Sequence, residues 1–417
     1  MSRYTIDPAS TLYIIMLGLL SALPPLAIDM GLPAIPALQS AFHIGIGEAT
    51  RTLTVFLLGF SAGPILFGPL ADRYGRKPVL LFGLGLFSLA ALACAGAGSI
   101  SALLAWRLVQ GVAAGAAAAL PAAIVRDVYS GHAALARQSH VALVNAVAPL
   151  LAPLLGAALL EVGNWRVIYV TLGVVGAALL LVSVFGYAET RPRPAAGADG
   201  GRNVLAAAMS AYGEVLGNRH YLVHAGLLAA SFGTMFAYIT GSSAVFIDML
   251  HVSGAAYGAL FALTAAGTVF GAAAGARLAR RWGADALLAA GVLASCVVGL
   301  VLLAVALTGA GSVASVAACV LLSNVCAGIV MPAATHQALS TVGHIAGSAA
   351  ALLRALQMLA GAGAGALVGL FAGNQLTVMA LVMALSALLG VLLLGLRRRL
   401  RDDAAAAKLL AAGSRGA

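Results

Sequence analysis

Charged and aromatic side chains are both scarce in this sequence of 417 residues. Charged residues make up 9% and aromatic residues 6%, whereas 62% of the chain is hydrophobic and its mean hydropathy is +1.03. A soluble protein needs polar cover over its surface, so this balance favours a membrane protein with several spans. The apolar runs are long and uninterrupted rather than short and alternating. That pattern excludes an outer-membrane barrel and predicts an all-α membrane protein.

Cysteine is also scarce, and residues that could form a reactive site are not grouped. The four cysteines lie inside apolar runs without C-x-x-C spacing, so we interpret them as small buried side chains rather than disulfides or metal ligands. The chain has no G-x-x-x-x-G-K-[ST] motif, no metal-ligand spacing and no nucleophile–base set. We therefore expect no enzyme, no catalytic residue, no metal and no cofactor, and any transport must be secondary.

Twelve apolar runs of about 20 residues divide into two sets of six. The longest polar interval, rich in Pro, Gly and Arg, separates the two sets. We predict an N-terminal six-helix bundle over 1–187, a cytoplasmic linker over 188–220, a C-terminal six-helix bundle over 221–396 and a basic cytoplasmic tail over 397–417. The predicted spans are 11–34, 50–71, 79–98, 102–123, 138–160, 167–187, 221–246, 256–277, 285–307, 312–334, 347–371 and 376–396.

The formal net charge of +10 arises from basic residues in the loops between these runs. With the N-terminus in the cytoplasm, nearly all loop Lys and Arg residues fall on the cytoplasmic side, and only Arg51 and Arg166 fall outside. This bias predicts a multi-pass protein of the bacterial inner membrane with both termini cytoplasmic. The charge therefore indicates membrane topology and contact with lipids rather than nucleic-acid binding.

A short repeat supports the division into halves. The stretch PLADRYG at Pro69–Gly75 aligns with RLARRWG at Arg277–Gly283, 208 positions later. Each copy follows the second span of its half. Two related halves in one membrane chain are typical of secondary transporters.

The first copy belongs to a longer motif that resembles G-x-x-x-D-R-x-G-R-[RK] of the major facilitator superfamily. The resemblance covers essentially the whole chain and implies two pseudo-symmetric six-helix bundles and a monomer. It also implies that this loop is a latch that closes the cytoplasmic side, with Asp72 as the acceptor for arginines. A basic turn that only sets the topology is the alternative. The motif residues are Gly68, Asp72, Arg73, Gly75, Arg76 and Lys77.

Asp29 is the only carboxylate well inside a predicted span, and it lies in the stretch IDMGLPAIP. A buried acid is normally held neutral or paired, which suits a proton carrier. The stretch resembles the DMYLPALP signature of the bicyclomycin/chloramphenicol-resistance branch of drug:proton antiporters, with Gly31 at the usual aromatic position. The resemblance implies that Asp29 couples transport to protons, and we place Met30 at the substrate cavity. A structural acid paired to a neighbouring span is the alternative.

The fourth span contains RLVQG, which resembles the R-x-x-Q-G motif of the same superfamily. The resemblance implies that Arg107 helps to couple proton movement to substrate binding. An intramembrane arginine needs a partner, and either Asp29 or Gln110 could provide one. Because Arg107 is near the outer end of its span, a side chain that extends to the membrane surface is the alternative.

The fifth span contains APLLAPLLGAA, which resembles a degraded form of the antiporter motif G-x-x-x-G-P-x-x-G-G. Pro149, Pro153 and Gly156 are retained, and alanines replace other glycines. In the eleventh span Arg354 is unexpected, and it could extend to the cytoplasm or contact an anionic substrate or a carboxylate. The polar residues that we assign to the substrate cavity, besides Met30, are Gln110, Asn145, Tyr238 and Gln357.

These observations predict a proton-coupled exporter of small, largely apolar or amphipathic drugs, similar to chloramphenicol or bicyclomycin, that works by alternating access. The expected partners are small-molecule substrates, protons and membrane lipids. A major facilitator exporter or importer of a specific metabolite is the alternative. Sugar carriers usually contain more Gln, Asn and Trp in their central spans than this chain does.

Overall fold

The computed structural model describes residues 6–190, 204–371 and 373–413, and in this part of the chain every regular element is a helix. Twelve helical segments are long and apolar enough to cross a membrane. This result confirms the predicted all-α class with twelve spans. The elements are α1 Thr11–Asp29, η1 Leu32–Ala34, α2 Ile35–Phe42, α3 Ile46–Tyr74, α4 Arg76–Ala95, α5 Ile100–Val128, α6 Gly131–Val162, α7 Arg166–Gly186, α8 Val204–Gly217, α9 Arg219–Ser243, η2 Ala244–Met249, α10 Gly254–Trp282, α11 Ala284–Leu307, α12 Val313–Ser340, η3 Gly343–Ile345, α13 Ala346–Leu370 and α14 Gln375–Gly413.

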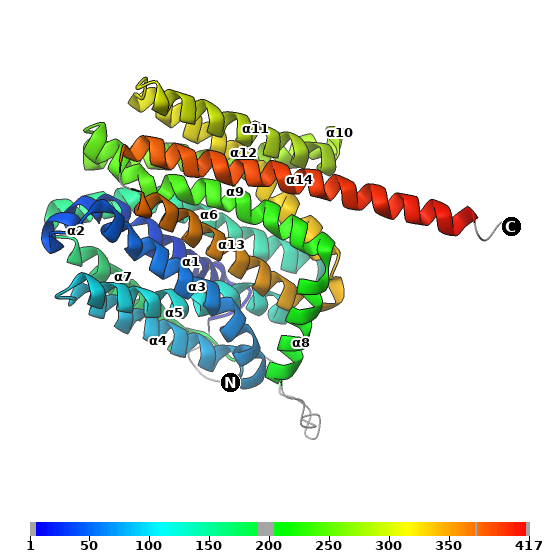
Figure 1. Ribbon diagram of the computed structural model, residues 1–417. Helices are drawn as coiled ribbons and strands as arrows, with labels where there is room; N and C mark the ends of the chain where they lie inside the picture. The colour runs from blue at the N-terminus through cyan, green and yellow to red at the C-terminus, as the bar shows by residue number, and fades with distance from the viewer. Residues whose placement is uncertain (1–5, 191–203, 372, 414–417) are drawn as a thin grey trace.

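The long helices pack side by side and run roughly parallel or antiparallel to one another (Figure 1). The start of α1, helix α8 and the C-terminal part of α14 lie at the same end of the molecule, which we call the linker end. Helix α2 lies at the opposite end. The six spans α1 and α3–α7 form the first bundle, and the spans from α9 to α14 form the second.

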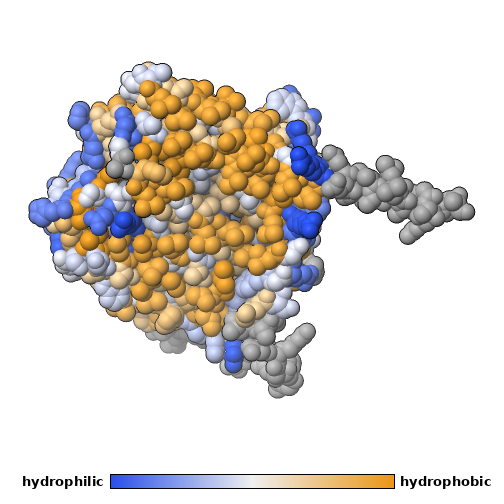
Figure 2. Space-filling model, viewed as in Figure 1, coloured by the Kyte–Doolittle hydropathy of each residue, from blue (hydrophilic) through white to orange (hydrophobic). Residues whose placement is uncertain are grey.

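Figure 2 shows an apolar surface over the middle of the visible face, with hydrophilic residues gathered at its two ends. Large apolar side chains point outward here, among them Phe82 at 63% exposure and Leu89 at 66%. Such an area of exposed hydrocarbon is stable against lipid tails and unfavourable in water. The surface therefore agrees with the span assignment.

Glycines bring helices of each bundle into backbone contact. A Cβ atom on Gly63 of α3 would lie 2.5 Å from the Cα atom of Gly115 in α5, and one on Gly271 of α10 would lie 2.1 Å from the carbonyl oxygen of Val325 in α12. Close approach of this kind holds helices together in lipid, where the hydrophobic effect does not. Gly63 and Gly271 are also 208 positions apart, so the internal repeat extends to the packing of the two bundles.

Several boundaries differ from those that hydropathy predicts. The first span has a break after Asp29 and continues through η1 and α2 to Phe42, because Pro33 and Pro36 restart the chain as short helical turns. The predicted linker 188–220 contains helix α8, while residues 191–203 of it lie outside the described residues. Helix α14 continues past residue 396, so the predicted bundle–tail boundary is not a helix end.

The two bundles meet most closely at the end opposite the linker. A Cβ atom on Gly47 of α3 would lie 2.0 Å from the carbonyl oxygen of Gly369 in α13. On the other side of the molecule, Gly258 of α10 packs against Leu154 of α6. At the linker end, in contrast, α3 and α13 leave a cavity between the bundles. The structure is therefore closed at one end and open at the other.

Candidate functional site

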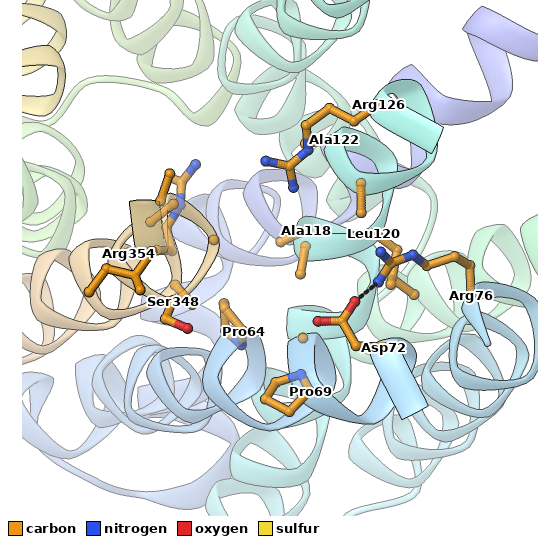
Figure 3. A pocket seen from close by; sticks show the side chains of 18 of the residues that line it. Pro64, Pro69, Asp72, Arg76, Ala118, Leu120, Ala122, Arg126, Ser348 and Arg354 are labelled. Carbon is orange, nitrogen blue, oxygen red and sulfur yellow. Dashed lines mark hydrogen bonds and ion pairs between the residues drawn. The ribbon is translucent and has the colours of Figure 1, made fainter. Parts of the chain in front are cut away.

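The cavity at the linker end has a volume of about 600 Å³ and lies between the two bundles (Figure 3). Helices α3 and α5 of the first bundle, α13 and η3 of the second, and the linker helix α8 contribute to its wall. Four charged side chains line it: Asp72, Arg76, Arg126 and Arg354. The remaining wall consists mostly of alanine, glycine and proline. The cavity is therefore large enough for a small molecule and carries a net positive lining.

The predicted latch motif lies at the edge of this cavity. Arg76, in the first turn of α4, donates from Nη1 to Asp72 at 2.6 Å and from Nε to Asp127 at 2.9 Å. Asp72 is near the end of α3 and Asp127 is near the end of α5. One guanidinium thus joins three helices of the first bundle through charge-assisted bonds. Asp72 has its ion pair within its own bundle.

Glu189, which the sequence did not indicate, binds the backbone of the motif. The carboxylate of Glu189 accepts hydrogen bonds from the backbone N–H groups of Arg76 at 2.9 Å and Lys77 at 3.0 Å. A carboxylate at this place is favourable because it satisfies free N–H groups and the helix dipole of α4. Gly75 has φ +100°, and a Cβ there would lie 2.5 Å from Glu189. Glycine is therefore required both by the backbone angle and by the space.

The other motif residues have more local contacts. Lys77 donates from Nζ to the backbone carbonyls of Val184 and Tyr187 at the end of α7. The exposed guanidinium of Arg73 lies 5.3 Å from the ring centroid of Tyr74. Gly68 lines the cavity, and a Cβ there would meet no atom within 4 Å. The cavity wall at Gly68 is thus open space rather than helix contact.

Tyr212 of α8 is a second contributor that the sequence did not reveal. Its hydroxyl donates to the backbone carbonyl of Ile65 at 3.4 Å, so the linker helix rests on α3 beside the cavity. Burial, and secondly the charge of Asp72, raise the pKa of Tyr212 above its ordinary value. No sequence signal could have placed Tyr212 or Glu189, because both lie in the interval that hydropathy marks only as a polar linker.

Asp29 is deeply buried at the C-terminal end of α1, with 4% of its surface exposed. Its Oδ1 atom has no hydrogen-bond partner among the described residues. The turn that follows it, η1, packs against α9 and α10 of the second bundle. No side chain of the described residues forms a hydrogen bond or ion pair with Asp29, so the alternative of a structural acid paired to a neighbouring span has no support. Asp29 is an orphaned acid at the contact between bundles.

Arg107 is 1% exposed, so the alternative of a side chain that extends to the membrane surface is wrong. It donates to the side chain of Gln110 at 2.8 Å and to the backbone carbonyls of Ala27 and Thr52, both at 3.2 Å. Its guanidinium also lies 4.3 Å from the ring centroid of Phe56. Of the two candidate partners, the structure selects Gln110. The reason is that carbonyls of α1 and α3 and the aromatic ring already surround the guanidinium inside the bundle.

The proposed antiporter helix is α6, which continues as a helix through Pro149 and Pro153. A Cβ on Gly156 would lie 2.2 Å from the backbone carbonyl oxygen of Met30. Gly156 thus lets α6 approach α1 directly beside Asp29. The motif resemblance and the position of the predicted coupling acid therefore meet at one helix contact.

The five residues predicted for the substrate cavity do not line the cavity at the linker end. Met30, Gln110, Tyr238 and Gln357 are buried, and Asn145 is half-buried. Tyr238 shares a hydrogen bond of 2.7 Å with Thr264, and Gln357 accepts one of 3.4 Å from Arg354. These side chains lie deeper in the bundles because the cavity occupies only the linker end. Their contribution to a substrate site stays a prediction.

Among the described residues, no group of His, Cys, Asp and Glu side chains is spaced to hold a metal ion. The site can therefore be described with charged side chains, hydrogen bonds and a cavity.

Comparison with known proteins agrees with this architecture. The chain is 30% identical over 385 residues to an uncharacterized transporter of the major facilitator type, YdgK, of Bacillus subtilis (strain 168), covering 90% of this chain and 93% of the relative. It is 30% identical over 281 residues to a bicyclomycin resistance protein homolog of Haemophilus influenzae, covering 66% and 69%. A multidrug resistance protein MdtL of Shigella dysenteriae is 29% identical over 58% of this chain and 60% of its own length.

Solved structures show the same fold at low sequence identity. A bacterial homolog of the human lysosomal transporter Spinster, in an inward-facing and occupied conformation, has a TM-score of 0.73 and 18% identity, covering 94% of this chain and 97% of its own. A D-xylose–proton symporter has a TM-score of 0.70 and 16% identity, covering 91% and 97%. A sequence model described as the Major Facilitator Superfamily matches residues 17–366. With twelve spans in two related bundles and the motif from Gly68 to Lys77, the chain is a transporter rather than an enzyme and belongs to the Major Facilitator Superfamily.

Proposed function

We propose that this protein is a proton-coupled secondary transporter that exports small, largely apolar or amphipathic drugs, similar to chloramphenicol or bicyclomycin, by alternating access. Two relatives, a bicyclomycin resistance protein homolog and a multidrug resistance protein, support the drug class by their names. The single structural observation that carries the proposal is the buried carboxyl of Asp29, whose Oδ1 has no partner among the described residues.

Proton coupling follows from the surroundings of Asp29. An ionised carboxylate in an apolar interior costs several kcal/mol unless it is paired. A proton that binds when Asp29 is connected to one side of the membrane, and leaves when it is connected to the other, removes this cost in alternation. Because Asp29 lies at the contact of α1 with α6 and faces the second bundle, its charge affects how the bundles pack. Drug and proton would then bind in exclusion of each other.

Arg107 and Gln110 hold the first bundle around this acid. The guanidinium of Arg107 donates to Ala27, two residues before Asp29, and to Gln110 of its own helix. The Nε2 group of Gln110 is buried and has no partner among the described residues. An unpaired amide donor and an unpaired carboxyl oxygen in one bundle give a proton or a polar drug group somewhere to bind. We assign Arg107 to the positioning of α1 and Gln110 to ligand contact.

The latch motif supplies the switch between the two states. In this structure the linker end is open, and Asp72 bonds to Arg76 of its own bundle. In the opposite state, as the family resemblance implies, the end of α3 moves towards α13 and Asp72 contributes to closing the cavity. From the positive-inside bias of the loops we infer that the linker end and both termini lie in the cytoplasm, in a bacterial inner membrane. We expect the monomer to be the working unit.

Drug accumulation in bacterial cells tests the proposal. Cells that make the wild-type protein should retain less chloramphenicol than empty-vector cells, and a protonophore should abolish the difference. Asp29→Asn should lose export against a gradient. Asp248→Asn is the matched control, because Asp248 is an exposed acid of η2. Equal retention by wild-type and empty-vector cells across a varied drug panel would reject drug export and favour a carrier of a specific metabolite. Full export by Asp29→Asn would remove Asp29 as the coupling acid.

A further inference from the structure

Two arginines of the cavity carry positive charge that no carboxylate of the described residues balances in an ion pair. Arg126 near the end of α5 has no hydrogen-bond or ion-pair partner among the described residues. Arg354 in the first half of α13 has only a hydrogen bond of 3.4 Å to the neutral Gln357. Figure 3 shows both side chains extending into the same cavity, Arg126 from the first bundle and Arg354 from the second. Both are exposed to the space between the bundles.

Asp72, the acidic side chain that lines the cavity, already forms an ion pair. Asp72 lies 2.6 Å from Arg76, and Arg76 also bonds to Asp127 outside the cavity lining. These three side chains form a closed set within the first bundle. Arg126 and Arg354 therefore remain as two uncompensated charges that line the same cavity, one from each bundle. Two like charges so placed repel each other, and a bound anion removes the repulsion.

The rest of the wall is suited to a small apolar body. Alanines of α5 and α13, together with Pro64 and Pro69 of α3, cover the surface beside the two guanidinium groups. A volume of about 600 Å³ is in the range of ordinary small-molecule sites. Two guanidinium groups without a carboxylate partner, next to an apolar wall, match one kind of ligand: a small apolar molecule with an anionic group at one side.

We propose that the cavity binds small amphipathic organic anions, with a carboxylate, sulfonate or phosphonate held between Arg126 and Arg354 and the apolar body against the alanine and proline wall. This inference rests on the proposed export function and names the substrate class that enters from the linker side. Because the two arginines belong to different bundles, the anion is held best when the bundles approach each other. Binding thus favours closure of the linker end, which is what a transported substrate must do.

Equilibrium binding to the purified full-length protein in a neutral maltoside detergent tests the substrate class. The probes are naphthalene-2-sulfonate and naphthalene-2-sulfonamide, which share their ring and differ in charge, and the measurement is isothermal titration calorimetry. The wild type should bind the sulfonate about tenfold more tightly than the sulfonamide, the ratio that about 1.4 kcal/mol of charge interaction provides. Arg126→Gln and Arg354→Gln should each remove most of this ratio, and Arg354→Lys should keep part of it.

The matched control is Arg280→Gln, since Arg280 is exposed on α10 outside this cavity and its loss should leave the ratio unchanged. Equal affinities of the wild type for the two probes would overturn the proposal, as would an equal loss of both in the glutamine variants. Displacement of the sulfonate by equimolar phosphatidylglycerol would assign the arginines to a lipid headgroup and also overturn it. Because binding is measured without a gradient, failure here is distinct from failure of proton-driven export.

Discussion

In each bundle the start of the third span is connected to the end of the sixth, but the connecting residues carry opposite charges. In the first, the start of α4 is tied to the chain after α7, because Glu189 accepts from the backbone of Arg76 and Lys77. In the second, the start of α11 is tied to α14, because Arg397 bonds to Asp285. Lys77 and Asp285 are 208 positions apart, and so are Glu189 and Arg397. The repeat has kept the connection between the third and sixth spans of each half and exchanged base for acid.

The halves differ more deeply at the motif itself. Asp72 of the first copy is part of an ion-pair network that lines the cavity. Arg280, at the same place in the second copy, is exposed and has no ion-pair partner among the described residues. The second half instead has a network around the buried guanidinium of Arg397, which also donates to His224 and Gln337. In both networks a largely buried guanidinium meets a carboxylate that is about half exposed, Arg76 with Asp72 in the first half and Arg397 with Asp285 in the second. The halves therefore differ in whether the motif position itself takes part in the network: Asp72 does, and Arg280 does not.

The largest loss of stability is expected when the network around Arg397 in the second bundle is removed. Arg397→Ala removes the guanidinium that joins Asp285, Gln337 and His224, and should destabilise the protein by about 3 kcal/mol. The measurement is equilibrium unfolding of the purified protein in mixed micelles with increasing SDS. The exposed neighbour Arg398→Ala should change stability little.

A charge exchange sharpens this first test. Asp285→Lys combined with Arg397→Glu copies the signs of the first bundle into the second, and it should recover part of the lost stability. If the double variant is no more stable than the Arg397→Ala protein, the two ties are not equivalent. The comparison between the halves would then fail at this position.

The next effect concerns the glycine contacts that the halves share. Gly63→Ala and Gly271→Ala each force a methyl group into the backbone of the neighbouring helix, and each should cost about 1–3 kcal/mol. Gly363→Ala is the matched control, since a Cβ there meets no atom within 4 Å. The same unfolding measurement should give similar losses for the two halves. A loss of stability in only one half would show that the two glycine contacts do not contribute equally to stability.

A smaller effect is expected for the acid that caps α4. Glu189→Ala leaves the backbone N–H groups of Arg76 and Lys77 without their acceptor, and should cost about 1 kcal/mol. Glu161→Ala removes an exposed acid from the opposite end of the first bundle and serves as the control. The loss should be smaller than that of Arg397→Ala, because Glu189 is exposed and water can replace it. A larger loss of stability for Glu189→Ala than for Arg397→Ala would contradict this expected order.

The smallest effect is a pH dependence at the switch. Burial and the charge of Asp72 raise the pKa of Tyr212 above its ordinary value of 10.0. Below pH 10 the phenol is neutral in both folded and unfolded chains and contributes no pH dependence. As pH rises from 10 to the raised value, only the unfolded chain ionises, so stability falls. Asp72→Asn should lower this pKa and shorten that range, as shown by ultraviolet titration against Tyr212→Phe. An unchanged titration would place Asp72 too far from Tyr212 to act on it.

Much of the fold was accessible from the sequence because hydropathy is a local property. Twelve runs and their division into halves were confirmed, and the motif from Gly68 to Lys77 led to the family. The partners of the motif were less accessible. Glu189 lies 113 positions from Arg76 along the chain, so no spacing rule connects them. Arg107 could have extended to the surface, and only the neighbouring α1 and α3 show that it does not.

The sequence by itself determined the membrane class, the number of spans and the presence of the repeat, since each depends on the transfer energies of residues that are near one another in the chain. Only the tertiary structure decided which charges are used. It paired Arg76 with Asp72 and Asp127, and it buried Arg397, which hydropathy assigns to the tail. It left Arg126 and Arg354 facing the cavity without a carboxylate. The physical reason is that an ion pair acts over a few ångströms, and distant segments come within that range only when the helices pack.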